Sequence, residues 1–418
     1  MYDLRLTSEQ LDIRATVRDF VAREIKPLVL HPDRLQAADR QLPAELFDKA
    51  SDLGLRTLAV SEHLGGAGAD ALTSCIVAEE LAVGDADVAD VLVHTSILGH
   101  VLFDTLMTPG QRARFLPPFL ANHRYHLACA AWESDADLGW RYHRPLAAAP
   151  DVTVAATRQP NGDWVLNGHD RFVPNAAVAS LIAVRAAPAV SAPRTFLVPR
   201  DTPGVAVREP ATFGAGADGE PVCSWSLGRG GALFLEHCRV PADHVLGGDE
   251  TGTTRLGAGP WGRGIPYVEA MNLGVGRAAY EAALEYAKLR VQGGRPIIGH
   301  QAIGAMLAEM AIKLEVARNT VWQAAWASDH PEAAAHRGIP DAPLQTIARV
   351  FVAAAVHEVT LRAAEVFGAM GVMRDMPMHK YVHDALVFLH SRDAHAAKLH
   401  IAEALAGYRR PPTPTNGN

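Results

Sequence analysis

The sequence lacks several features that mark special classes of protein. It has four cysteines among 418 residues and no CxxC pair, which argues against a disulfide framework or a zinc site and is typical of a reducing compartment. Its net charge is −7 and it has no basic run, which argues against nucleic acid as a partner. The first residues contain no apolar segment of a signal peptide, and no apolar run approaches the ~20 residues that span a bilayer. We therefore expect a cytoplasmic protein with no metal site and no membrane span.

The composition is that of a globular chain with more than one core. Apolar residues make up 49% of the sequence and charged residues 20%. With 418 residues, the chain is long enough and apolar enough for two or three domains. The pattern of hydrophobic residues predicts helices, then short strands, then helices again. We expect a helical domain over residues 1–125, a β-barrel domain over 126–246, a helical bundle over 247–408 and a disordered tail over 409–418.

The first domain shows helical spacing of its apolar residues. We expect helices over residues 46–55, 71–83 and 103–119. The third should break at Pro117-Pro118, because proline lacks an N–H and its ring clashes with the preceding turn.

The second domain has the pattern of short strands separated by turns. Residues 152–157 and 164–166 flank Gln159-Pro-Asn-Gly-Asp163, which is a hairpin signal. Four further apolar runs predict strands, at residues 181–184, 195–198, 205–207 and 232–235.

The third domain contains long helices. Apolar residues that step by three and four predict a buried stripe, comprising Leu307, Met310, Leu314, Ala317, Val321 and Ala324. An alanine-rich helix should end at Phe367-Gly368-Ala369-Met370-Gly371, because glycine takes a positive φ without steric cost. A turn with so little side chain also exposes N–H groups that suit phosphate. On spacing alone, a helix end without any ligand is the alternative.

Four segments of the C-terminal half resemble the acyl-CoA dehydrogenase family. Residues 365–371, EVFGAMG, and His383-Asp384-Ala385 are similar to its Q-x-F-G-G-x-G … R-D-A segment. Residues 286–294 and 300–310 are similar to its Y-x-x-x-R-x-x-F-G … H-Q-x-x-x-x-x-L-A-E-M signature. The resemblance continues over roughly residues 6–405.

The resemblance implies an α+β fold of acyl-CoA dehydrogenase type, with an N-terminal helical domain, a middle β-domain and a C-terminal four-helix bundle. It implies FAD held between the subunits of a homodimer or homotetramer. It also implies α,β-dehydrogenation of an acyl-CoA thioester, with hydride transfer to flavin N5 and an electron-transfer flavoprotein as acceptor.

Several residues match family positions around the FAD diphosphate. The resemblance implies that Arg290 pairs with it, and a guanidinium suits that role through its fork geometry. Without the resemblance, a solvated surface arginine is the simpler interpretation. Gln301, Glu365, Gly368 and Ala369 match other positions around the dinucleotide. Glu365 replaces the family glutamine, so an acceptor stands where a donor is usual, and Gly293 replaces an aromatic residue.

The residues expected beside the isoalloxazine depart further from the family. Trp132 and Glu133 lie in residues 130–139, where the family has T-E-P-x-A-G-S-D. Phe172, Val173 and Pro174 lie where it has W-I-T. Phe172 can still stack on the ring, whereas Pro174 has no hydroxyl or N–H to donate to N5.

The usual catalytic glutamate is missing. Its position aligns with Arg392, or with Ser391 if one residue is deleted. Asp393 is the adjacent carboxylate, although it is equally suited to cap the last helix. Some branches of the family place the base on an earlier helix, and Glu269 is the nearest carboxylate there.

These departures leave three hypotheses for function. The first is an FAD-dependent acyl-CoA dehydrogenase with Asp393 or Glu269 as a displaced base. The second is a flavoenzyme of the same fold with oxidase, monooxygenase or acyl-CoA lyase chemistry, in which Arg392 binds an anionic group of the substrate. The third is a non-catalytic subunit that pairs with an active relative in a heteromer.

Overall fold

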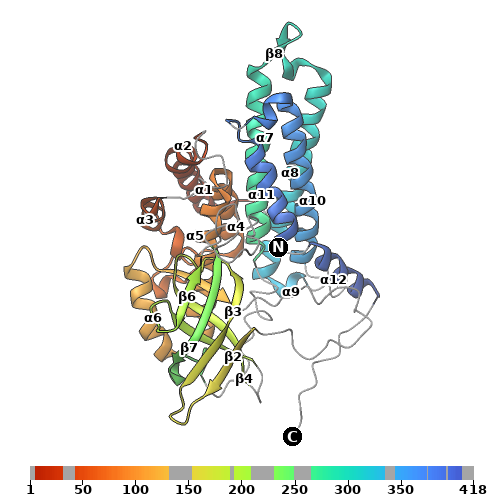
Figure 1. The fold of residues 1–418 in the computed structure, drawn as a ribbon. Helices are drawn as coiled ribbons and strands as arrows, with labels where there is room; N and C mark the ends of the chain where they lie inside the picture. Colours follow the sequence, from red (N-terminus) through yellow and green to blue (C-terminus); the bar gives the residue numbers. More distant parts are fainter. Residues whose placement is uncertain are drawn as a thin grey trace, which may run out of the picture.

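The structure is a computed structural model that describes residues 5–31, 43–130, 153–188, 193–208, 230–248, 265–334, 344–373, 375–391 and 394–406. Figure 1 shows short N-terminal helices beside a β-sheet and a tall bundle of long helices. This is the α+β architecture that the sequence predicted, with its helical, sheet and helical parts in the expected order.

The N-terminal part is helical because its polar residues cap successive apolar segments. Thr7 and Gln10 form a capping box at the start of the first helix, and the Asp70 carboxylate accepts from the Thr73 N–H at 2.7 Å. The elements are α1 (Ser8–Phe20), η1 (Val21–Ile25), α2 (Lys26–Val29), α3 (Ala44–Asp52), η4 (Leu55–Thr57), η5 (Glu62–Leu64), α4 (Ala71–Gly84), α5 (Ala86–Gly99), η6 (His100–Leu106) and α6 (Pro109–Ala121).

The predicted break at Pro117-Pro118 is wrong. Helix α6 continues through both prolines to Ala121, and the Asn122 N–H still donates to the Pro118 carbonyl at 3.2 Å. Two features offset the lost donors. The prolines stand near the C-terminal end, where few further turns depend on them, and the buried Phe115 and Phe119 hold the helix against the core. The helix also begins later than predicted, because Thr108 caps it.

The segment Ala86–Leu106 has the length and apolar composition of a membrane span, but 89% of its apolar 18-residue window is buried inside the protein. It is therefore accounted for as a core helix of the N-terminal part. No other helix in the described residues has this combination of length and hydropathy.

The middle part is one sheet. Its described strands follow the order β1-β4-β2-β3-β7-β6, and β5 also pairs with β4. The predicted hairpin is confirmed: β2 and β3 are antiparallel, and the Gln159 N–H donates to the Asp163 carbonyl at 2.7 Å. The strands are β1 (His126–Ala130), β2 (Val154–Arg158), β3 (Trp164–Val173), β4 (Ala179–Pro188), β5 (Arg194–Pro199), β6 (Val205–Arg208) and β7 (Gly231–Val240), followed by η8 (Ala242–His244).

The C-terminal part is built on the four long helices α7, α8, α10 and α11, which stand side by side in Figure 1. The predicted stripe on α8 is confirmed, since all six of its residues are buried. Helix α10 ends at Phe367 as predicted, and Gly368 follows with φ of 59°. The elements are α7 (Tyr267–Leu289), β8 (Val291–Gln292), β9 (Arg295–Pro296), η9 (Ile297–Gly299), α8 (Gln301–Asp329), α9 (Pro331–Ala334), α10 (Leu344–Phe367), η10 (Gly368–Val372), α11 (Met378–Ser391) and α12 (Ala394–Ala406).

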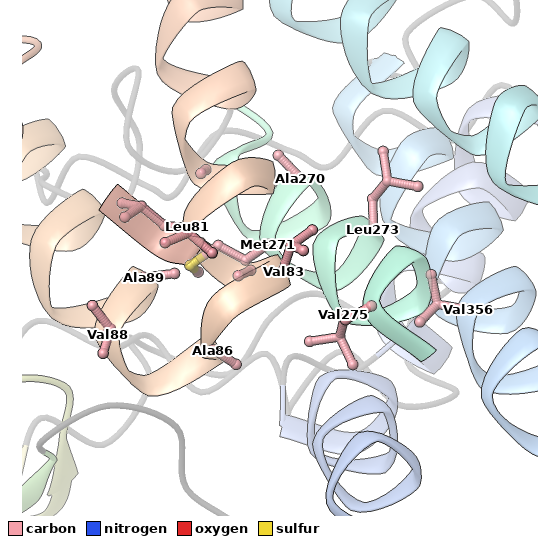
Figure 2. Packing of buried hydrophobic residues seen from close by; sticks show 14 of the residues in the cluster. Leu81, Val83, Ala86, Val88, Ala89, Ala270, Met271, Leu273, Val275 and Val356 are labelled. Atoms are coloured by element: carbon pink, nitrogen blue, oxygen red, sulfur yellow. The ribbon is translucent and has the colours of Figure 1, made fainter. Parts of the chain in front are cut away.

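One hydrophobic cluster joins the N-terminal helices to the bundle. It contains buried residues from Val17 in α1 to Phe388 in α11, and Figure 2 shows Leu81 and Val83 of α4 facing Met271 of α7. Helices α4 and α7 approach so closely that a Cβ at Gly274 would lie 2.4 Å from the Glu79 carbonyl oxygen. The sheet has a separate core of its own.

A buried ion cluster connects helix α11 to the α4–α5 junction. The Lys380 Nζ lies 3.0 Å from Asp85 Oδ2 and 2.6 Å from Asp384 Oδ2. All three side chains are at most 3% exposed. Asp85 also caps α5, because its Oδ1 accepts from the Asp87 and Val88 N–H groups. The cluster therefore fixes the start of α5 relative to the bundle.

Candidate functional site

The residues expected at the diphosphate meet at one end of the bundle, which we call the bundle tip: residues 289–301 and 367–373. Helix α7 ends there, α8 begins there and α10 ends there, with the β8–β9 hairpin at the top of Figure 1. The Arg290 N–H donates to the Tyr286 carbonyl at 2.8 Å, and its own carbonyl accepts from Ile297 at 2.8 Å. The Tyr286 and Phe367 rings stack with centroids 4.2 Å apart. Sequence positions about 80 residues apart are thus side by side.

The bundle tip presents a cation and open backbone to solvent. Arg290 is exposed, and its guanidinium has no ion-pair partner among the residues that the structure describes. Gly294 and Gly368 both have positive φ, and a Cβ at either would meet no atom within 4 Å. Gln301 and Ala369 are also exposed there. An unpaired guanidinium beside accessible backbone is suited to bind a phosphate group.

Glu365, the predicted replacement for the family glutamine, is already paired. Its Oε2 accepts from Arg362 Nη1 at 2.7 Å, one turn earlier on the exposed face of α10. The arginine offsets the negative charge that the carboxylate would otherwise place near a phosphate.

The residues expected beside the flavin ring lie at the end of β3. Phe172 is 37% exposed, and its ring lies against Gly230, where a Cβ would come within 2.5 Å of it. Its N–H donates to Asp170 Oδ1 at 3.1 Å. Val173 is fully buried, so it packs in the sheet core and only the Phe172 ring is accessible. Pro174 begins the turn that follows.

Two residues of this region were missed by the sequence reasoning. Asn175 has φ of 61° and is fully buried; its Nδ2 donates to the Val91 carbonyl of α5 at 3.1 Å, while its Oδ1 is buried without a partner in the described residues. Asn is the residue that best tolerates positive φ after glycine, and this was the available signal. Asp170 is half-buried, and burial raises its pKa, although the Phe172 N–H partly offsets this.

The candidate base Glu269 is in an ion pair. It lies in the first turn of α7, is 7% exposed, and its Oε1 accepts from Arg349 Nε of α10 at 3.3 Å. Trp132, Glu133, Arg392 and Asp393 lie outside the described residues, so their placement remains a prediction. Among the described residues, no cluster of His, Cys, Asp or Glu could hold a metal ion.

The Phe172 turn and the bundle tip lie at different positions along the axis of the bundle. Glu269 and Arg290 stand at opposite ends of α7, about 30 Å apart at 1.5 Å per residue. Figure 1 shows β3 beside the lower half of the bundle, far from the β8 hairpin. Within one chain, therefore, the Phe172 turn and the bundle tip do not form a single pocket.

Comparison with known proteins assigns the chain to one family. Models of the N-terminal and C-terminal domains of acyl-CoA dehydrogenase match residues 7–123 and 266–389. A probable acyl-CoA dehydrogenase of Mycobacterium leprae is 30% identical over 398 residues, covering 93% of this chain and 92% of the relative.

Solved structures agree with this assignment. Butyryl-CoA dehydrogenase from Megasphaera elsdenii superposes with a TM-score of 0.79 at 26% identity, over 97% of this chain and all of the other. A glutaryl-CoA dehydrogenase from Mycobacterium smegmatis in complex with FADH2 shares the fold, with a TM-score of 0.77 at 21% identity over 98% of this chain and 97% of the other. The chain belongs to the acyl-CoA dehydrogenase family.

Proposed function

We propose that the protein is an FAD-dependent oxidoreductase that dehydrogenates an acyl-CoA thioester between its α and β carbons. The observation that carries this proposal is the Arg290 guanidinium, exposed and unpaired among the described residues, at the bundle tip between glycines that leave the backbone open. Surface arginines are often solvated and unpaired; what sets Arg290 apart is its place beside the open backbone of Gly294 and Gly368, at the position that matches the family's diphosphate arginine.

The family binds FAD, and the described residues fit that cofactor. Arg290 and Gln301 offer donors to the diphosphate, and the glycines at 294 and 368 admit it to the backbone. The exposed ring of Phe172 offers an apolar face to the isoalloxazine. Pro174 gives that edge no donor, so the flavin is oriented by other groups than in relatives with threonine there.

The chain's own part in the reaction is to hold the thioester and to accept the α proton. FAD, when bound, supplies the acceptor for the β hydride. A positioned carboxylate speeds proton removal by about 10²–10⁴-fold. Glu269 is held by Arg349, so it would have to leave that ion pair to accept the α proton. Asp393 and Glu269 remain the two candidates for the base.

The distance between the two groups of residues favours a site shared by two copies of the chain. The ribityl chain between the isoalloxazine and the diphosphate is short, whereas Figure 1 shows β3, which carries Phe172, far from the β8 hairpin at the bundle tip. One copy would supply the Phe172 turn and the other the bundle tip. The exposed apolar residues at the tip, Leu289, Val291 and Val372, are between 60% and 82% exposed and suit such a contact.

The experiment is a visible spectrum of the purified protein, followed by anaerobic addition of a panel of acyl-CoA esters. We expect a flavin spectrum that bleaches with at least one ester. Arg290→Gln should lose the flavin, whereas Arg295→Gln in the adjoining hairpin should keep it, because Arg295 is also exposed but its guanidinium contacts His300.

Other outcomes would reject this proposal in favour of the alternatives. A flavin that stays oxidised anaerobically while the protein consumes oxygen with a substrate would indicate oxidase or monooxygenase chemistry. A colourless protein that gains flavin only with an active relative would indicate a partner subunit.

The shared site has a test of its own. Arg290→Gln carries a defect at the tip and Phe172→Ala a defect at the β3 turn. Mixing the two after dissociation should restore part of the flavin binding, because one mixed site contains neither change. If the mixture binds no more flavin than the separate variants, the shared site is wrong.

A further inference from the structure

A cavity of about 540 Å³ lies between the N-terminal helices and the bundle, away from the candidate flavin residues. None of the residues discussed for FAD or for the base lines it. Its walls come from the N-terminal elements α1, η1 and α2, from α4, and from the bundle helices α7 and α8. The lining residues are Arg14, Arg18, Val21, Ala22, Lys26, Ile76, Glu79, Glu80, Val83, Arg277, Glu281, Glu315, Arg318 and Trp322.

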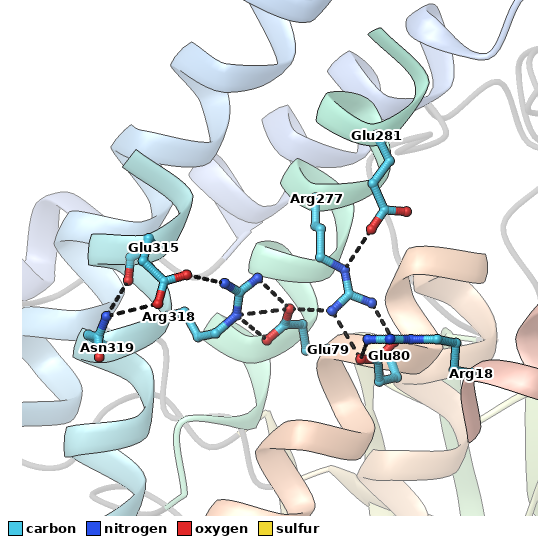
Figure 3. A network of polar contacts seen from close by, with 8 residues as sticks. All are labelled: Arg18, Glu79, Glu80, Arg277, Glu281, Glu315, Arg318 and Asn319. Atoms are coloured by element: carbon cyan, nitrogen blue, oxygen red, sulfur yellow. Dashed lines mark hydrogen bonds and ion pairs between the residues drawn. The ribbon is translucent and has the colours of Figure 1, made fainter. Parts of the chain in front are cut away.

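A network of ion pairs lines one part of the cavity and is drawn in Figure 3. The buried Glu79 carboxylate accepts from Arg277 at 2.6 Å and from Arg318 at 3.0 Å. The buried Glu80 carboxylate accepts from Arg18 at 2.7 Å and also from Arg277. Burial raises the pKa of Glu80, but its hydrogen bonds to Arg277 and Arg18 outweigh burial and hold that pKa below its ordinary value. Both carboxylates are thus engaged by guanidinium groups.

The side chains that line the cavity carry more positive than negative charge. Five cationic and four anionic side chains line it. Two of the anions, Glu281 and Glu315, are 45% and 63% exposed and so are screened by water. The half-buried Arg14 has no carboxylate or hydrogen-bond partner within the described part of the chain. The cavity therefore favours an anionic ligand.

Arg14, Ile76 and Trp322 all line the cavity, and contacts of their helices place them at the same level. On α1, Gln10 bonds Thr73 at 3.1 Å and Arg18 bonds Glu80, which places Arg14 level with Ile76 of α4.

The position of α8 follows from similar contacts. The Asp329 carboxylate accepts from the Ala71 N–H at 3.0 Å, and Arg318 bonds Glu79. These two contacts align α8 antiparallel to α4 and place Trp322 at the level of Ile76. Arg14, Ile76 and Trp322 are therefore at the same level and line the same part of the cavity.

We propose that this end of the cavity binds a small organic carboxylate with an apolar, flat body. The Arg14 guanidinium would pair with the carboxylate in fork geometry. Trp322 and Ile76 would cover the apolar body, as in most small-molecule sites, where a few polar groups orient a ligand held by apolar walls. A cationic ligand is disfavoured because every buried carboxylate here already has guanidinium partners. The ligand would hold α1 against α8 and thus stabilise the docking of the N-terminal helices on the bundle.

The test uses benzoate as the probe, with the full-length protein. Calorimetric titration should show saturable benzoate binding, and benzoate should raise the melting temperature, since a ligand that binds only the folded state stabilises it. Benzyl alcohol lacks the charge and acetate lacks the ring, so both should bind at least about tenfold more weakly. If acetate bound as tightly as benzoate, the apolar side chains would have no role in binding. If benzyl alcohol bound as tightly as benzoate, the Arg14 guanidinium would have none.

Two arginines of the same helical run give matched variants. Arg14→Gln should weaken benzoate binding about tenfold or more, whereas Arg23→Gln should not, because Arg23 pairs with Asp19 at the surface outside the cavity. Trp322→Leu should weaken benzoate more than acetate. The flavin spectrum of Arg14→Gln should match that of the unchanged protein, which separates this site from the proposed function. No saturable benzoate binding, or binding unchanged in Arg14→Gln, would reject the proposal.

Discussion

The buried cluster of Lys380, Asp85 and Asp384 gives the sharpest prediction about stability. Replacing Lys380 by Met keeps the length and apolar stem of the side chain but removes its charge. Two carboxylates that are at most 3% exposed would then remain without their shared cation. Such a change tests whether the N-terminal helices depend on an ionic contact with α11.

The expected magnitude follows from burial. Breaking a buried ion pair by removing one partner costs about 3–5 kcal/mol, because the remaining charge stays desolvated. A change of this size lowers the melting temperature by several degrees even in a large domain. Urea unfolding followed by tryptophan fluorescence, and thermal unfolding followed by circular dichroism, would both report it.

A matched control is available on the surface of the bundle. Lys313 lies 2.9 Å from Glu358 of the neighbouring α10, but these side chains are 37% and 48% exposed. Lys313→Met should therefore cost less than about 1 kcal/mol. If Lys380→Met and Lys313→Met destabilise the protein equally, the reasoning from burial is wrong.

Three further predictions concern packing, pH and the β3 turn. Gly274→Ala should destabilise by about 1–3 kcal/mol in urea unfolding, because its Cβ would meet the Glu79 carbonyl at 2.4 Å; Gly110→Ala, where a Cβ meets nothing within 4 Å, should be neutral or slightly stabilising. Burial lowers the pKa of His126 to about 4 from 6.5, so the unfolded state binds its proton first and stability should fall by about 3 kcal/mol as pH drops from 6.5 to 4; a His126→Gln variant that keeps the same pH slope would contradict this. Asn175→Ala should cost about 1–3 kcal/mol and speed amide exchange in residues 175–178, because alanine neither tolerates φ of 61° nor bonds the Val91 carbonyl; unchanged exchange would disprove it.

The features that the sequence predicted well depend on local patterns. The α8 stripe follows from spacing by three and four, the β2–β3 hairpin from its turn residues, and the end of α10 from a glycine with positive φ. Each requires only residues close in sequence, so tertiary contacts had little opportunity to override them.

The features that were missed depend on partners far along the chain. Pro117 and Pro118 remain helical because of packing that their own sequence does not reveal. Lys380 and Asp85 are almost 300 residues apart, so their ion pair could not be expected from either position. The same holds for the candidate site: the residue types at the bundle tip were predicted, but the pairing of Glu269 with Arg349 was not.

The hydrophobic cluster shared by α4, α5 and α7 has a consequence for synthesis on the ribosome. The first helices are made long before the bundle that covers them, with the whole sheet in between. At about 5–20 residues per second, the interval from Gly99 to Tyr267 lasts on the order of 10–30 s. During that time the apolar residues of α5 that belong to the shared cluster, from Val88 to Ile97, have no bundle to cover them. The nascent chain should therefore depend on chaperones that shield this segment until α7 emerges.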